Sequence, residues 1–223
     1  NLSFHNFVAF FQSKKTVGTL VYSFVIALIT TVICLLIAYP TAYILAKLKV
    51  KTGPAMLMLF VMPMWINFTL RITALKEILT LIEGNLAMHA YANTIICMVY
   101  DFLPFMILPL YNTIAKLDNS YIEAAEDLGC TPVQVFGKVI LPLSVPGILS
   151  GMPMVFVPAV STFYISQKLG GTETVLIGDV IERQFKQGNN PNLGAALSLV
   201  LMLLVFVCTG IMNRFGDDEE VIV

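Results

Sequence analysis

Charged side chains are scarce in this chain of 223 residues. Asp, Glu, Lys and Arg make up 12% of it, whereas they make up about 25% of a typical soluble domain. The formal net charge is −1, and the sequence has no basic stripe of the kind that nucleic-acid-binding domains carry. Hydrophobic residues reach 57%. The composition therefore argues against nucleic-acid binding and indicates an integral membrane protein.

Groups that carry catalysis or bind metals are equally sparse. The only histidines are His5 and His89, and neither lies in a long apolar run. No C-x-x-C pair and no Cys/His metal spacing occurs. No Ser/His/Asp arrangement can be assembled either. We therefore expect no disulfide, no metal site and no intramembrane enzyme. The four cysteines are Cys34, Cys97, Cys130 and Cys208.

A phosphate-binding loop is also missing. The pattern G-x-x-x-x-G-K-[ST] would be needed to hold the phosphates of ATP. Gly137-Lys138 comes nearest, but Pro132 stands where the upstream glycine would be. We therefore expect this chain neither to hydrolyse ATP nor to hold a cofactor of its own.

Long apolar runs dominate what is present. A bilayer core about 30 Å thick needs roughly 20 apolar helical residues. We predict an all-α membrane protein with a single transmembrane domain, 1–223. Prolines inside several runs indicate either kinked helices that line a pathway or kinks without function. A mixed segment at 1–19 precedes the runs, and it fits a helix on the membrane surface or an ordinary connecting helix. The predicted spans are 20–46, 54–70, 90–110, 145–164 and 193–212.

The polar segment 111–144 separates the third and fourth of these runs. Ser120 and Glu123 match a capping box at the start of a first helix, and Gly129 fits its left-handed end. Pro132 is expected to open a second helix, which runs into Leu141. The predicted apolar face of the first helix consists of Tyr121, Ala124, Ala125 and Leu128. The segment fits a helix–turn–helix that docks in a groove of another protein, or a solvated connection.

This segment resembles the signature of ABC importer permeases. The family pattern is E-A-A, three residues, Gly, nine residues and I-x-L-P. Here Val139 takes the place of the Ile. The resemblance implies that 111–144 is a cytoplasmic coupling loop, which sits in a cleft of a separate ATPase that binds ATP and Mg²⁺. The implied coupling residues are Glu123, Ala124, Ala125, Asp127, Gly129, Pro132, Leu141 and Pro142.

The resemblance also settles the orientation, which lysine and arginine leave open because they are divided almost evenly between the two sides. It places the coupling loop and the tail with Arg214 in the cytoplasm and 1–19 outside. Since the family usually has six spans, we expect a further span before Asn1. The external stretch near 81–89 is short for the family, and we expect further residues there.

Stretches along nearly the whole chain look like the spermidine/putrescine permeases of this family. Examples are Met62 to Asn67, with Arg71 following, and Leu103 to Met106. This likeness implies a type I ABC importer permease fold in the bacterial inner membrane. It also implies a second, different permease subunit, two copies of an ATPase and an external polyamine-binding protein as partners.

Asp101 is the only carboxylate deep within a predicted span, between Tyr100 and Phe102. An ionisable group there costs about 2.5–3.5 kcal/mol to insert, which makes it a functional candidate. A carboxylate beside aromatic rings suits an ammonium ion. The alternative is a structural pair with Arg71. Weaker candidates for the pathway are Trp65, Asn67, Tyr111 and Tyr164.

We therefore expect the import of polyamines by alternating access. One alternative keeps the machinery and changes the cargo, for example to ferric iron or sulfate. An oxyanion would favour cationic residues within the spans, and only Arg71 is near one. Another alternative is a channel or secondary transporter without an ATPase. Such proteins often have two related halves, and no internal repeat is found here.

Overall fold

The computed structural model describes residues 14–47, 52–170, 174–186 and 191–220. Every regular element in these ranges is a helix, which confirms the predicted all-α class. The elements are α2 (Lys14–Lys47), α3 (Thr52–Val61), η1 (Met62–Trp65), α4 (Phe68–Glu83), η2 (Leu86–His89), α5 (Ala90–Ala115), α6 (Asn119–Asp127), α7 (Pro132–Val135), η3 (Phe136–Ile140), α8 (Leu141–Leu143), α9 (Val145–Ser161), η4 (Ser166–Gly170), α10 (Ile177–Lys186) and α11 (Pro191–Glu220).

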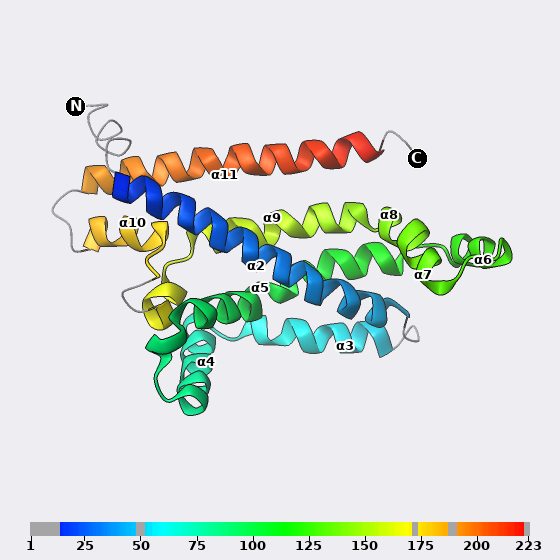
Figure 1. The fold of residues 1–223 in the computed structure, drawn as a ribbon, viewed down its shortest axis with the longest axis horizontal. Helices are drawn as coiled ribbons and strands as arrows, with labels where there is room; N and C mark the ends of the chain where they lie inside the picture. The colour runs from blue at the N-terminus through cyan, green and yellow to red at the C-terminus, as the bar shows by residue number, and fades with distance from the viewer. Residues whose placement is uncertain (1–13, 48–51, 171–173, 187–190, 221–223) are drawn as a thin grey trace.

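Three helices form the centre of the bundle. α5 packs against both α2 and α9, and these two also pack against each other. α3 lies on α2, and α11 lies on α9 and α10. In Figure 1 the long helices run along the longest axis of the molecule. The short helices α6 to α8 and the end of α11 lie at one end, and α4, α10 and the start of α2 lie at the other.

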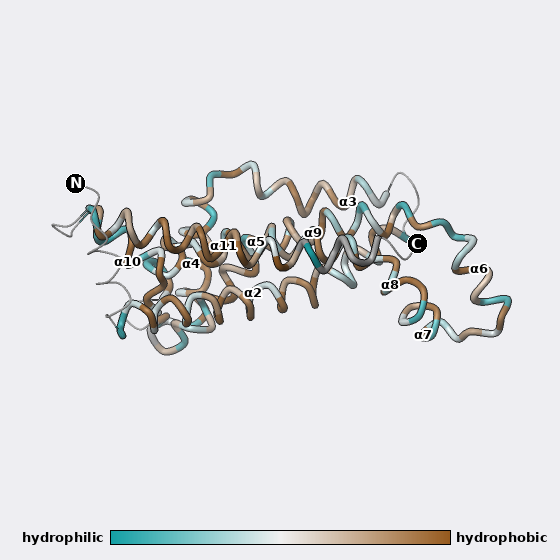
Figure 2. The backbone as a smooth tube through the Cα atoms, turned by 90° about the horizontal axis from the view of Figure 1, so that it is seen from above, coloured by the Kyte–Doolittle hydropathy of each residue, from teal (hydrophilic) through white to brown (hydrophobic). Residues whose placement is uncertain are grey.

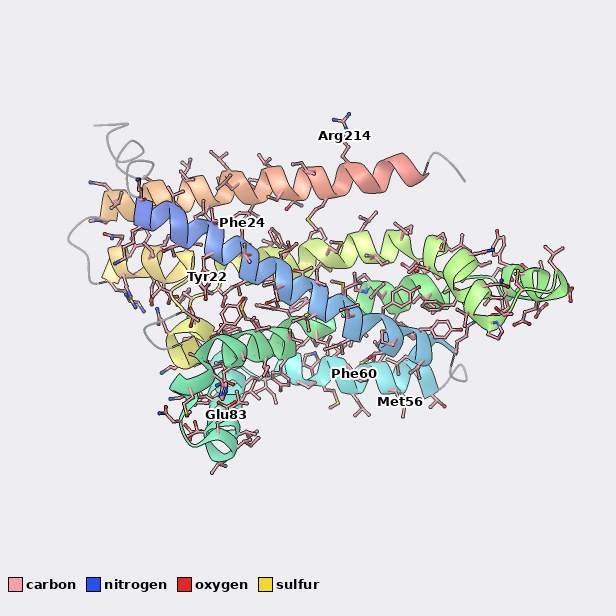
Figure 3. All side chains as sticks on the ribbon, viewed as in Figure 1. Tyr22, Phe24, Met56, Phe60, Glu83 and Arg214 are labelled. Carbon is pink, nitrogen blue, oxygen red and sulfur yellow. The ribbon has the colours of Figure 1, made fainter. Side chains whose placement is uncertain are left out.

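The outer helices expose their apolar side chains. In the most apolar stretch of α5, 61% is buried inside the bundle. In the corresponding stretch of α11, only 17% is buried. Figure 2 shows hydrophobic backbone along the long helices and more polar segments towards the ends. Met56 and Phe60 of α3 are exposed, and Arg214 points away from the bundle (Figure 3). In water such large apolar surfaces would be unfavourable, so these faces meet lipid or other subunits.

The helices that could cross a membrane overlap the predicted spans. Within the described ranges, three helices are long and apolar enough to cross a membrane. The number of candidate spans rises to five if each of two bent helix pairs counts as one span. α2 contains 20–46, and it already includes Lys14 to Thr19 of the proposed surface segment; the rest of that segment, 1–13, lies outside the described residues. α5 extends past 110 to Ala115, which therefore shortens the predicted loop. α9 ends at Ser161, before the predicted 164.

The predicted span 54–70 is not one helix. α3 ends at Val61, and the chain bends by 97° before α4. Pro63 lies in the intervening turn η1, and Ile66 is extended with ψ 142°. The side chain of Asn67 then caps α4 by accepting the backbone N–H of Thr69 at 2.9 Å. Two local preferences therefore break the span: a proline, which cannot continue the hydrogen-bond ladder, and a strong N-cap.

Close contact between α5 and α9 depends on small residues. A Cβ atom on Gly147 of α9 would lie 2.7 Å from Oγ1 of Thr113 and 3.2 Å from the carbonyl oxygen of Pro109, both on α5. A Cβ on Gly151, one turn further along α9, would lie 2.6 Å from Sδ of Met106. Helices in membranes approach closely through such small residues at four-residue spacing. This contact joins the two helices on either side of the polar loop.

We predict that Gly147→Ala destabilises the subunit by about 1–3 kcal/mol, because the added methyl group overpacks the α5–α9 contact. The matched control is Gly210→Ala on α11, where a Cβ meets nothing within 4 Å. This control should be neutral or slightly stabilising, since Ala favours helix over Gly. The thermal unfolding midpoint in detergent measures both. Equal midpoints for the two variants would contradict the close packing.

Candidate functional site

A buried ion pair joins α4 to α5. Nη2 of Arg71 lies 2.7 Å from Oδ1 of Asp101, and the two side chains are 9% and 2% exposed. Asp101 lies near the middle of α5, whereas Arg71 lies in the first turn of α4. The bend between α3 and α4 brings this turn to α5. The ion pair with Arg71, which the sequence analysis gave as the alternative role of Asp101, is therefore present.

The two charges depend on each other. A cation in the first turn of a helix opposes the helix dipole, and a buried carboxylate without a counter-ion would cost several kcal/mol. Nε of Arg71 has no hydrogen-bond partner among the described residues. The guanidinium group is therefore held mainly by the carboxylate of Asp101.

The pair lines a cavity of about 340 Å³ between α4, α5 and the end of α9. Aromatic rings form much of its wall. The rings of Phe68 and Tyr164 are 6.1 Å apart, within the usual range of aromatic pairs. Nζ of Lys168 lies 5.5 Å from the centre of the Tyr164 ring. The lining residues are Phe68, Arg71, Asp101, Phe102, Phe105, Pro158, Ser161, Thr162, Phe163 and Tyr164.

Three of the predicted pathway residues meet in this cavity: Asp101, Phe102 and Tyr164. The other four lie outside its lining. Tyr100 and Trp65 are exposed on the surface of the described bundle. Asn67 is the N-cap of α4. Tyr111 lies beside Gly53, near the start of α3 and at the opposite end of the bundle; its hydroxyl is 3.4 Å from the position that a Cβ on Gly53 would take.

Sequence reasoning missed three aromatic residues of the wall: Phe68, Phe105 and Phe163. Phe105 could have been found, because it follows Asp101 by four residues and therefore shares its face of the helix. The other two come from α4 and from the segment after α9. Only the bend before α4 and the packing of the bundle bring them to Asp101, and no local pattern predicts this.

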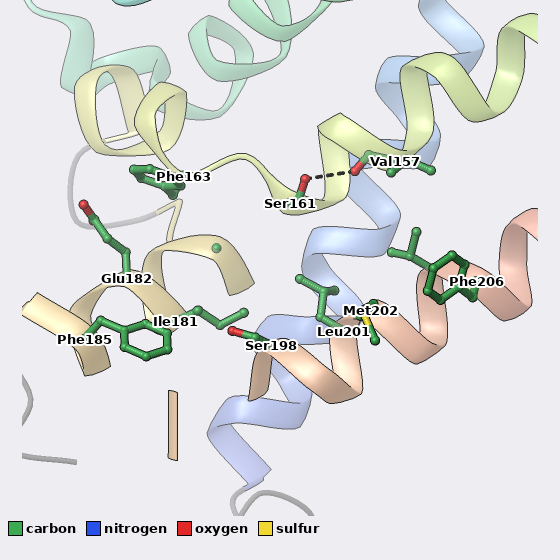
Figure 4. Close-up of a pocket in the computed structure, with 12 residues that line it drawn as sticks. Val157, Ser161, Phe163, Ile181, Glu182, Phe185, Ser198, Leu201, Met202 and Phe206 are labelled. Carbon is green, nitrogen blue, oxygen red and sulfur yellow. Dashed lines mark hydrogen bonds between the residues drawn. The ribbon is translucent and has the colours of Figure 1, made fainter. Parts of the chain in front are cut away.

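A larger cavity of about 590 Å³ lies between α9, α10 and α11, and Figure 4 shows its lining. The side chains around it are mostly apolar, for example Phe185, Leu201 and Phe206. Glu182 is the one charged residue of this lining, and hydrogen bonds from Lys186 and Gln167 lower its pKa. This cavity suits apolar groups. The smaller cavity, with its buried charges, is the better candidate for a polar ligand.

A second buried carboxylate lies near the same end of the bundle, in α10. Oδ2 of Asp179 accepts hydrogen bonds from Oγ of Ser166 at 2.5 Å and from the backbone N–H of Leu176 at 2.9 Å. Burial raises the pKa of Asp179, although these hydrogen bonds oppose the shift. Oγ of Ser23 accepts the N–H of Ile177 at 2.7 Å. These bonds fasten η4 and α10 to α2.

At the opposite end, α6 to α8 form a compact projection. The N-cap of α6 is Asp118, whose side chain accepts the N–H of Ser120 at 3.0 Å. This hydrogen bond lowers the pKa of Asp118. The predicted capping box of Ser120 with Glu123 is therefore wrong, because a carboxylate two residues earlier takes the role. In the second helix Oε1 of Gln134 accepts the backbone N–H of the N-cap Thr131 at 2.9 Å, which forms a capping box.

Gly129 ends α6 in the left-handed conformation that the sequence predicted, with φ +80°. Its N–H donates to the carbonyl of Glu126 at 2.8 Å, and the N–H of Cys130 donates to the carbonyl of Ala125 at 3.1 Å. These two bonds form a Schellman motif. A side chain at this φ is strained although the space around it is open.

The predicted apolar face of α6 is only partly buried. Ala125 packs inward with Val135 and Ile140. Tyr121, Ala124 and Leu128 are exposed, Leu128 by 86%. The short α7 covers only a narrow strip of α6, which leaves most of the predicted apolar face on the surface. Val133 of α7 is also exposed, by 80%. The projection therefore presents apolar side chains outward.

Glu123 lies exposed on this projection and, among the described residues, has no hydrogen-bond or ion-pair partner. Asp127 and Pro132 are exposed as well. Leu141 and Pro142 lie on α8, which leads back into α9. The signature residues thus divide between the outward surface of the projection and its base.

The projection is firmly attached to α2. The ring of Phe136 packs edge-on against Tyr39 at 5.6 Å and against Tyr43 at 5.8 Å between ring centres. The hydroxyl of Tyr39 also lies 2.7 Å from Oγ of Ser144, in a hydrogen bond. A force on the projection would therefore reach α2 as well as α5 and α9.

Comparison with known proteins agrees with this architecture. Residues 7–217 match the family described as "Binding-protein-dependent transport system inner membrane component". The chain is 43% identical to the spermidine/putrescine transport system permease protein PotB of Haemophilus influenzae in an alignment 212 residues long, which covers 86% of this chain and 74% of that protein. Identity to PotB of Escherichia coli is 40% in an alignment 201 residues long, which covers 83% of this chain and 73% of that protein.

Among solved structures, the chain is similar to one of a bacterial ABC transporter involved in the import of the acidic polysaccharide alginate. The TM-score is 0.78 at 15% identity, over 98% of this chain and 84% of that one. At this identity the likeness concerns the fold alone. It confirms the type I ABC importer permease fold that the resemblance implied.

We predict that Arg71→Gln destabilises the subunit by about 3–5 kcal/mol, since it leaves the Asp101 carboxylate buried without its partner. The double variant Arg71→Gln/Asp101→Asn removes both charges and should recover most of the loss. The thermal unfolding midpoint in lipid discs is the measurement. A double variant as unstable as the sum of the two single variants would show that the charges do not act as a pair.

Proposed function

Because the chain belongs to the family of binding-protein-dependent transport system inner membrane components, we propose that it is the permease subunit of a polyamine importer driven by a separate ATPase. It forms part of the translocation pathway and moves polyamines such as spermidine or putrescine across the inner membrane by alternating access. The observation that carries this proposal is the projection α6 to α8, with its exposed apolar side chains and with Glu123, which has no hydrogen-bond or ion-pair partner in the described part of the chain.

Coupling to the ATPase runs through this projection. The apolar contact surface consists of Tyr121, Leu128 and Val133. Exposure of these side chains to water is unfavourable unless a partner covers them. Glu123 adds a carboxylate that is free to pair with the partner. The two ATPase subunits bind ATP and Mg²⁺, and this chain converts their closure into movement of its helices. The proposed contact and positioning residues are Glu123, Ala124, Ala125, Asp127, Gly129, Pro132, Leu141 and Pro142.

The connectivity supports such a conversion. α5 leads directly into the projection, and α9 leads directly out of it. Both helices also line the cavity around Asp101. Movement of the docked projection is therefore transmitted to two walls of the cavity at once.

The cavity suits a cation with apolar segments. Asp101 offers a carboxylate, and Phe102 and Tyr164 offer aromatic faces, which attract ammonium groups. The PotB relatives, by their names, transport spermidine and putrescine. We propose the same cargo class for this chain, with Asp101, Phe102 and Tyr164 as its contacts within the membrane.

Two further partners complete the proposed importer. A second, homologous permease subunit provides the other half of the pathway and covers part of the exposed apolar surface. An external polyamine-binding protein delivers the cargo at the end that holds α4 and α10. The projection then faces the cytoplasm.

We predict that Glu123→Lys and Gly129→Asp abolish spermidine uptake in cells without other polyamine importers. The first variant reverses the charge at the proposed ATPase contact, and the second strains the turn that sets the angle of α6. The subunit should still insert and pair with the second permease. The matched control is Gly137→Asp, in the same loop, where φ is not positive and a Cβ meets nothing within 4 Å. Normal uptake in both test variants would refute the coupling role.

A further inference from the structure

We propose that Arg71 and Lys168 are resident cations, which hold the places of the cargo's ammonium groups at Asp101 and Tyr164 and give way when a polyamine enters. This inference rests on the proposed polyamine cargo. It assigns to each of the two cations a role as competitor of the cargo, so that the empty cavity is never left with an uncompensated carboxylate.

Among the described residues, Asp101 and Asp179 are the buried carboxylates, and Oδ1 of each lacks a hydrogen-bond donor, but their other partners differ. Asp179 accepts fixed hydrogen bonds from Ser166 and from the backbone of Leu176, as a structural carboxylate does. Asp101 is bound by the guanidinium group of Arg71, and among the described residues no hydroxyl or backbone N–H donates to it. A single cation on a long side chain is a partner that another cation can replace.

Arg71 is also poorly fastened. It lies in the first turn of α4, where the helix dipole opposes a positive charge, and its Nε has no partner among the described residues. The segment Thr52–Trp65, which comprises α3 and η1, meets α4 at an angle of 97° across Ile66 and Asn67. The guanidinium group can therefore leave Asp101 without the loss of other hydrogen bonds.

The second place is the ring of Tyr164, which lines the same cavity. Nζ of Lys168 lies 5.5 Å from the ring centre, within the range of a cation–π contact. Lys168 is exposed and belongs to the short helix η4. Its ammonium group is the same chemical group that a polyamine carries.

A linear polyamine matches both places together. One ammonium group replaces Arg71 at the carboxylate, and another replaces Lys168 at the aromatic ring. The methylene segments between them lie against the rings of Phe68, Phe102 and Phe105, as the stems of lysine side chains lie on apolar surfaces. A monovalent cation without such a stem could take only one of the two places.

The test measures spermidine uptake by proteoliposomes that contain the whole complex with its binding protein. If the polyamine replaces these two cations, Lys168→Met lowers the spermidine concentration at half-maximal uptake about twofold to fivefold, because a competitor at an exposed cation–π site is removed. The control is Lys186→Met, which removes an exposed lysine paired with Glu182 and should leave this concentration unchanged.

Arg71→Gln should lower the spermidine concentration at half-maximal uptake about tenfold below the wild-type value, although the variant is less stable. Arg71→Gln/Asp101→Asn should raise it above the wild-type value, because the carboxylate is gone. If instead this double variant takes up spermidine like the wild type, the pair is only structural and the exchange is refuted. An unchanged concentration in Lys168→Met would refute the role of Lys168. A wild-type complex that takes up no spermidine would refute the cargo class itself.

Discussion

The ion pair of Arg71 and Asp101 is the constraint on which the arrangement of the cavity depends. A carboxylate in the middle of a membrane helix needs a counter-ion, and here α4 has to enter the bundle to supply it. The break after α3 makes this entry possible, and Asn67 caps the new helix at the point of turning. Phe68 and the aromatic wall of the cavity follow from the same geometry.

The cavity and the projection lie towards opposite ends of the same helices. α5 carries Asp101 and continues to α6, while α9 starts after α8 and reaches the cavity at Pro158. Small residues keep the two helices in close contact, so they can move together. Phe136 extends this connection to α2 through two tyrosines. A permease needs such a continuous path from the ATPase surface to the cargo.

Much of this could be predicted from the sequence where the signal is local. The apolar runs predicted the long helices, and Gly129 predicted the left-handed turn. The sequence predicted Ser120 as the N-cap of α6, whereas the structure has Asp118 in this position. Both residue types suit an N-cap, and only the geometry of the chain decides between them. The bend within 54–70 also has local signals, Pro63 and the N-cap Asn67, but the apolar length of the run predicted a single span. Phe68 and Phe163 were missed because only the packing of the bundle brings them to Asp101.

The most direct test of the account is ATP hydrolysis by the assembled complex in lipid discs, with the binding protein present and spermidine titrated. We expect hydrolysis to rise with the spermidine concentration and to saturate, because cargo at Asp101 and nucleotide at the ATPase bias the same movement of α5 and α9. An assembled complex that hydrolyses ATP at the same rate with and without polyamines would contradict it.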